Sequence, residues 1–113
     1  MGLVARNFIS ASTLGDIAAC ERDLARIDAA FAAHAAYIEE VGWGVRLFRS
    51  PREFEWEGLA DFVYDAAGRY PFLFVNCTWE GTLADEPAFL ATIVREHGLR
   101  EVGPRRRRWW WWW

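Results

Sequence analysis

Apolar residues recur at alternating intervals of three and four between residues 17 and 41. The stripe consists of Ile17, Cys20, Leu24, Ile27, Phe31, His34, Ile38 and Val41. This period belongs to one face of an α-helix, and it is sustained for more than three heptads. Gly42-Trp43-Gly44 follows the stripe and is typical of a helix end. The pattern therefore predicts one long N-terminal helix over residues 17–41.

Alanine dominates the other faces of this helix in its second half. The alanines that surround Phe31 and His34 are Ala29, Ala30, Ala32, Ala33, Ala35 and Ala36. Small side chains on all sides let other backbones approach from more than one direction. Two interpretations remain open at this point: the helix is the central helix of the domain, or it is one half of a homodimer contact.

Short apolar or alternating segments predict four β-strands. They cover residues 3–9, 45–49, 72–75 and 99–102. The segment 72–75 is apolar throughout, as expected for a central strand covered on both faces, whereas 99–102 is expected to be peripheral. Glu53-Phe-Glu-Trp-Glu57 alternates acids with aromatics, which suits a short edge strand or an extended lead-in.

Two shorter helices complete the predicted elements. One is expected near residues 57–67, ending at Gly68, and the other opens at Asp85-Glu86-Pro87 and closes at Gly98. Helices and strands alternate, so the expected fold is α/β or α+β. We expect one domain over residues 1–104, with one long helix and two shorter helices on a sheet of about four strands. The pattern does not predict strand order or direction.

Residues 105–113 differ in character from the rest of the chain. They are Arg105, Arg106, Arg107, Arg108, Trp109, Trp110, Trp111, Trp112 and Trp113. Arginines attract phosphates, and tryptophans settle at membrane interfaces or stack on bases, so this tail predicts binding to anionic lipid or single-stranded nucleic acid. Over these nine residues the composition resembles short synthetic Arg/Trp antimicrobial and cell-penetrating peptides. Two homopolymer blocks in succession are equally typical of an appended tag or a placeholder run.

Acidic residues gather between residues 53 and 65. Glu57, Asp61 and Asp65 are four residues apart on the expected second helix, and Glu53 and Glu55 precede them. Three carboxylates on one helix face repel each other by about 0.2–0.5 kcal/mol per adjacent pair. Residues 1–104 carry 16 acids against nine arginines, a net charge of −7. The acidic row is either a binding face for a basic partner or an ordinary solvated face.

The basic and cysteine residues exclude several classes of function. All 13 basic residues are arginines, which excludes a P-loop lysine, a Schiff-base lysine and PLP chemistry. Cys20 and Cys77 do not form a C-x-x-C pair or a disulfide framework, which favours a reducing, cytoplasmic setting. No run of 18 apolar residues is present, so we expect no transmembrane segment.

Four residues have side chains that commonly bind zinc: Cys20, His34, Cys77 and His97. Cys20 and His34 lie about 21 Å apart if they share one helix, so they cannot hold the same ion. Both occupy positions of the apolar stripe, where a buried thiol and a hydrogen-bonded neutral histidine are expected. We therefore expect no bound metal and no cofactor.

A catalytic pocket is the main alternative to a binding role. Ligands of open α/β sheets gather at the carboxyl ends of strands, where this sequence places polar residues. The pocket candidates are Arg49, Ser50, Asn76, Cys77 and Thr78. Cys77 is the candidate nucleophile and His97 the candidate base, although a buried cysteine in a core strand explains the same residue.

The leading hypothesis from the sequence is a non-catalytic protein-interaction module or a small subunit of an assembly. It would contact a basic partner through the acidic face, or a second copy through the 17–41 helix. The two alternatives are a small enzyme with a pocket around Cys77 and a binder of anionic membranes or nucleic acid through the tail.

Overall fold

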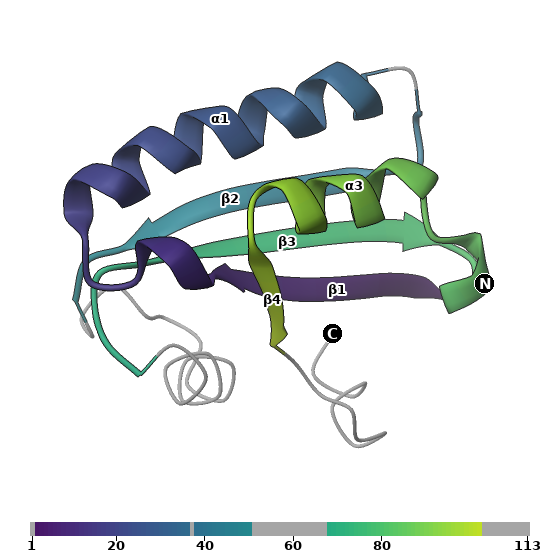
Figure 1. Cartoon of the computed structure of the whole chain (residues 1–113). Coiled ribbons are helices and arrows are strands. Elements are labelled where there is room, and N and C mark those ends of the chain that lie inside the picture. Colours follow the sequence, from purple (N-terminus) through teal and green to yellow (C-terminus); the bar gives the residue numbers. More distant parts are fainter. Residues whose placement is uncertain (1, 37, 51–67, 103–113) are drawn as a thin grey trace.

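Four strands form one antiparallel sheet, and both described α-helices cover one of its faces (Figure 1). The structure is a computed structural model that describes residues 2–36, 38–50 and 68–102. In chain order the elements are β1 (Leu3–Ser10), the 3-10 helix η1 (Ala11–Thr13), α1 (Ile17–Ala35), β2 (Gly42–Phe48), β3 (Phe72–Glu80), the 3-10 helix η3 (Leu83–Asp85), α3 (Ala88–Glu96) and β4 (Leu99–Val102). The fold is therefore of the α+β class.

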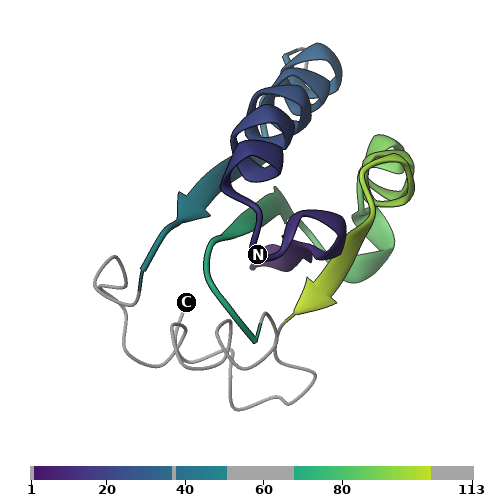
Figure 2. The same cartoon turned by 60° about the vertical axis from the view of Figure 1, so that its left-hand side comes forward.

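The strand order is β2-β3-β1-β4, and every neighbouring pair is antiparallel. With the element order β-α-β-β-α-β, this is the ferredoxin-like, split β-α-β topology. α1 covers the β2 side of the sheet and α3 covers the β4 side (Figure 2). β2 and β4 are thus the two edge strands of the described sheet.

β3 is a central strand, as predicted for residues 72–75, but it continues to Glu80. Every second side chain of β3 from Leu73 to Trp79 is buried, which explains why the strand extends beyond residue 75. These residues are Leu73, Val75, Cys77 and Trp79, and all point to the face that the helices cover. We call this the helix face of the sheet. The polar residues Asn76 and Thr78 alternate with them on the opposite face.

The main core lies between the helix face and the two helices. Ile27 and Phe31 of α1, and Leu90 and Ile93 of α3, are all buried there. The central-helix interpretation of α1 is therefore confirmed. The stripe around Phe31 faces this domain's own sheet, and a homodimer contact through another face of the helix stays a prediction.

α1 ends at Ala35, six residues before the end predicted from the stripe. The physical reason is the return to the sheet, because Gly42 has to pair with Thr78 of β3. A Cβ on Gly42 would lie 2.8 Å from the Thr78 hydroxyl oxygen, so any other residue at this position would require the Thr78 side chain to shift. Gly42-Trp43-Gly44 therefore starts β2 and does not end the helix.

The stripe also overstates the core at three of its positions, and the first of these is Ile38, which is 36% exposed beyond the end of α1. His34 is exposed, and its ring stacks on Phe89 of α3 at a centroid distance of 5.3 Å. Ile17 is 40% exposed at the start of α1. The expectation of a buried, hydrogen-bonded histidine at position 34 is wrong, because the helix turns it toward the rim of the α1–α3 contact.

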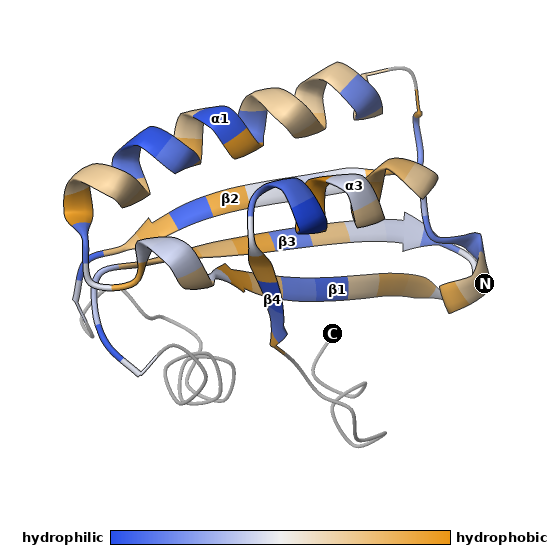
Figure 3. Cartoon of the chain, viewed as in Figure 1, coloured by the Kyte–Doolittle hydropathy of each residue, from blue (hydrophilic) through white to orange (hydrophobic). Residues whose placement is uncertain are grey.

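The opposite face of the sheet carries a smaller buried cluster. It consists of Ile9, Phe48, Phe72 and Val102. Figure 3 shows hydrophobic runs interrupted by hydrophilic residues along the strands, and both faces of the sheet therefore carry apolar side chains. Near the centre of this face, the Asn76 side-chain amide donates a hydrogen bond to Asn7 Oδ1 at 2.8 Å.

The described part of the chain contains two α-helices, whereas three were expected. The expected third helix near residues 57–67 and the alternating segment 53–57 lie outside the described residues. The helix expected after Asp85 is present as α3, which begins after Pro87, and Gly98 follows it with a positive φ of 60°. That conformation favours glycine, so the predicted helix end is confirmed.

Candidate functional site

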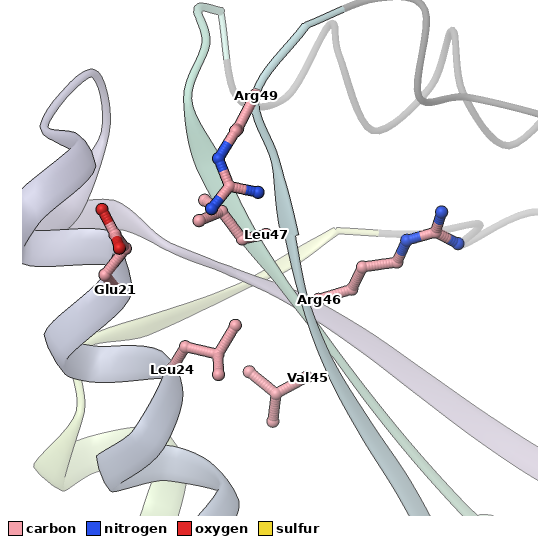
Figure 4. A pocket seen from close by; sticks show the side chains of 6 residues that line it. All are labelled: Glu21, Leu24, Val45, Arg46, Leu47 and Arg49. Atoms are coloured by element: carbon pink, nitrogen blue, oxygen red, sulfur yellow. The ribbon is translucent and has the colours of Figure 1, made fainter.

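An open groove of about 410 Å³ lies between α1 and β2 (Figure 4). Its lining residues are Glu21, Leu24, Val45, Arg46, Leu47 and Arg49. In Figure 4 the aliphatic side chains of Leu24 and Val45 face each other, and Glu21 and Arg49 lie toward one end of the groove. Arg46 points away, to the other side of β2. Three of the six lining residues are aliphatic and three are charged, so the groove combines apolar and charged surface.

Trp43 fixes β2 against α1 and so shapes this groove. Its ring stacks on Phe31 with a centroid distance of 6.2 Å and an interplanar angle of 7°. Its indole Nε1 donates a hydrogen bond to Asp28 Oδ1 at 3.1 Å. Stacking and the hydrogen bond together hold a half-buried aromatic side chain in one orientation.

The outer edge of β2 has no partner strand among the described residues. β2 has seven residues, and every edge strand exposes a row of backbone N–H and C=O groups that can pair with another chain. Arg46 and Arg49 are both exposed. In the described ranges neither forms an ion pair, although the Arg46 guanidinium lies 5.0 Å from the centre of the Phe48 ring. The edge thus offers hydrogen bonds, apolar surface and positive charge.

The pocket predicted at the strand ends does not form. Asn76, Cys77 and Thr78 lie within β3 and not at its end. Arg49 and Ser50 follow Phe48, which pairs with Phe72 at the start of β3. Even their nearest members, Arg49 and Asn76, are therefore roughly 16 Å apart along the sheet. The prediction is wrong because β2 and β3 are antiparallel, so the carboxyl end of one lies beside the amino end of the other.

Cys77 lacks the properties of a catalytic nucleophile. Its side chain is fully buried, and burial raises the pKa of the thiol to about 11, with a further contribution from the Glu86 carboxylate. Within the described residues, no hydrogen bond joins it to His97, which is half-buried at the end of α3. A thiol with a raised pKa is protonated at neutral pH and is a weak nucleophile.

Cys20 is also fully buried. Burial raises the pKa of its thiol, which donates a hydrogen bond to the Thr13 carbonyl at 3.3 Å. Both cysteines are free thiols. The described ranges contain no group of three or more potential metal ligands. None of the helices in those ranges has the length and hydropathy needed to cross a bilayer.

Arg6 forms an ion-pair network on the helix face that the sequence pattern did not indicate. It donates to both oxygens of Glu101 of β4, at 2.8 and 3.0 Å, and also to Glu86, which precedes α3. These hydrogen bonds raise the pKa of the guanidinium, mainly through Glu101. The Arg6 guanidinium thus donates hydrogen bonds to two carboxylates, and this network joins β1, β4 and the segment just before α3.

The predicted binding residues of the acidic cluster lie outside the described residues. These are Glu53, Glu55, Glu57, Asp61 and Asp65. The same is true of the tail, residues 105–113. Among the predicted site residues that the structure describes, only Arg49 lines the groove. The sequence indicated β2 as a strand, but it carried no signal that β2 is an edge strand next to α1.

Comparisons with known proteins give no family for this chain. No protein-family model, no curated protein and no solved structure matches it. The functional argument therefore rests on the chemistry of the described residues, since a shared topology alone does not indicate an activity.

Proposed function

We propose that this protein is a non-catalytic protein-interaction module, or a small subunit of a larger assembly. The contact surface in this proposal is the outer edge of β2 together with the groove between β2 and α1. The observation that carries it is a seven-residue edge strand with no described partner strand, lying directly beside a groove lined by aliphatic and charged residues.

This combination supports binding of another polypeptide. An added strand gains main-chain hydrogen bonds from the edge, and an adjoining groove accepts its alternate side chains. Leu24, Val45 and Leu47 supply the apolar part of the groove. Trp43, held by Phe31 and Asp28, keeps β2 in place, so little ordering of this edge is needed on binding.

A catalytic role is less well supported than binding. The candidate nucleophile Cys77 is buried and its pKa is raised to about 11. Two buried free thiols suit the cytoplasmic setting that we propose with this function. The acidic residues 53–65 extend the proposal to a basic partner, on the evidence of the sequence alone.

The tail carries the second proposal, also from the sequence alone. Binding through Arg105 to Arg108 requires the full chain to sediment with anionic vesicles or bind single-stranded DNA at low salt, and to be released at moderate salt. A chain truncated after residue 104 is the matched control. Equal sedimentation of the two chains rules out a role for the tail.

Site-specific photo-crosslinking tests the main proposal. A benzophenone amino acid replaces Ala25, which is exposed one turn from Glu21 on α1, and in the control it replaces Ala88, which is exposed on α3. Discrete protein adducts are expected from position 25 in cells, with few or none from position 88. Absence of adducts from position 25, or the same adducts from both positions, would rule out this surface.

A further inference from the structure

We infer that the partner at the edge of β2 is a second copy of this chain, paired antiparallel along β2 about a two-fold axis at Gly44. This inference rests on the proposed function, because it uses the same edge and names the occupant. It makes one continuous eight-stranded sheet from two four-stranded sheets. An isologous contact of this kind requires the surface to be complementary to itself.

The charges at the two ends of β2 meet that requirement. Glu39 and Glu40 lie just before the strand, and Arg46 and Arg49 lie near and after its end. All four side chains are exposed, and none forms an ion pair within the described part of the chain. In an antiparallel pair, the acidic end of each copy lies beside the basic end of the other. Both ends of the contact therefore become attractive at once.

The centre of β2 permits close approach of two backbones. Gly44 is exposed, and a Cβ placed on it would meet no atom within 4 Å. With Gly44 on the axis, Trp43 of one copy lies across from Val45 of the other, on the helix face. Aromatic and β-branched residues are favourable cross-strand pairs in antiparallel sheets.

The exposed side of α1 next to β2 also accommodates a second copy. Glu21, Ala25, Asp28 and Ala32 follow one another at helical spacing on that side. Ala25 and Ala32 are exposed and small, so the α1 helices of two copies can approach above the joined sheet. Such a contact covers Leu24, Val45 and Leu47, the apolar lining of the groove.

Charge reversal with light scattering is the first test. The wild-type chain is expected to be a dimer, and either Arg49→Glu or Glu39→Arg with Glu40→Arg is expected to raise the dimer dissociation constant at least about tenfold. The first variant places an acid at each end of β2, beside the remaining Arg46, and the second is basic at both ends. A mixture of the two is therefore expected to form a heterodimer, which only an antiparallel contact between these ends explains. All three substitutions are at exposed positions, and circular dichroism verifies the fold.

Disulfide trapping is the second test and reports the register. Opposed residues of antiparallel strands have Cα atoms about 4.5–5.5 Å apart, which a disulfide can span. Gly44→Cys is therefore expected to give a covalent dimer rapidly under mild oxidation. The natural cysteines Cys20 and Cys77 are buried and are not expected to compete for disulfide formation. Ala88→Cys, exposed on α3, is the matched control and is expected to give no covalent dimer.

The outcomes separate this inference from the proposed function. A monomeric wild-type chain at high concentration, or a mixture of the charge variants that stays monomeric, overturns self-pairing. If photo-crosslinks from position 25 then join a different protein, the interaction role survives with another partner. If position 25 also gives no adducts, both are wrong.

Discussion

The two edge strands of the sheet are built in opposite ways. β4 has four residues, and its exposed positions are the charged Arg100 and Glu101. β2 has seven residues, and its helix-face positions are the apolar Trp43, Val45 and Leu47. Short length and charge are the usual means by which proteins protect a sheet edge from further pairing. β4 has both, whereas β2 has only the single charge of Arg46 within the strand.

The comparison shows how one sheet can have one edge that is protected from further strand pairing, β4, and one edge that can accept another strand, β2. We call the β4 edge the closed side. At β4, Glu101 is bound to Arg6 of the neighbouring strand, so the edge charge serves the chain itself. At β2, the side-chain contacts run inward, from Trp43 to Phe31 and Asp28 of α1. The interior holds β2 firmly while its outer hydrogen-bonding groups have no described partner strand. Three experiments test this difference, and a fourth tests the thiol in the strand between the two edges.

The largest effect is expected from Phe31→Ala, which removes the support beneath β2. Phe31 is fully buried and contacts both Trp43 and Phe89, so its truncation leaves a cavity that costs about 3–5 kcal/mol of unfolding free energy. Urea denaturation measures this loss at fixed protein concentration. Phe31→Leu keeps most of the volume and is expected to lose less; equal losses in both variants would contradict a packing role.

Arg6→Met tests the closed side of the sheet. The substitution leaves Glu86 and Glu101 without their shared cation, which costs about 1–2 kcal/mol, since hydrogen bonds to charged groups exceed neutral ones and Glu101 is partly exposed. Hydrogen exchange of the β4 amides is expected to rise more than that of β2. Unchanged stability and exchange would show that β4 does not depend on this network.

Asp28→Ala releases the Trp43 indole and tests how firmly β2 is held. Loss of this partly exposed hydrogen bond is expected to cost about 0.5–1 kcal/mol. Tryptophan fluorescence and denaturation measure the effect. Asp28→Asn keeps an acceptor oxygen and is the control. A loss of the same size in both variants would mean that charge, and not the hydrogen bond, fixes Trp43.

The smallest effect at neutral pH concerns Cys77, between the two edges. Its pKa is raised to about 11 in the folded chain, against about 8.5 for an unperturbed thiol. A raised pKa contributes stability below the unfolded value, and this contribution is lost as the pH rises through the folded value. The free energy of unfolding is therefore expected to fall between about pH 8.5 and 11.

Cys77→Val is the control for this pH dependence. It is expected to flatten the alkaline fall without removing it, since the Cys20 pKa is also raised. Alkylation of Cys77 near neutral pH is expected to be slow in the folded chain and fast after denaturation. Rapid labelling of the folded chain would contradict the burial of this thiol and favour the catalytic alternative.

Local pattern was sufficient for much of the fold. The apolar run at 72–75 predicted a central strand, and Gly98 predicted the end of a helix, because burial and backbone conformation at these positions depend on nearby residues. The same reasoning failed at the end of α1. The stripe to Val41 satisfies a helix locally, but the pairing of Gly42 with Thr78, 36 positions further along the chain, requires the helix to end earlier.

The candidate site was largely beyond the reach of the sequence. Arg49 was predicted as a site residue, but it was grouped with Asn76 and Cys77. The error arose because strand direction cannot be read from composition or hydrophobic period. The sequence also gave no indication of the Arg6 ion pairs, because its partners Glu86 and Glu101 are 80 and 95 positions away along the chain. Periodicity within a segment decides which residues form a strand or helix and which side is buried. Only the pairing of distant segments decides that β2 lies at an edge, beside α1, with its groove open.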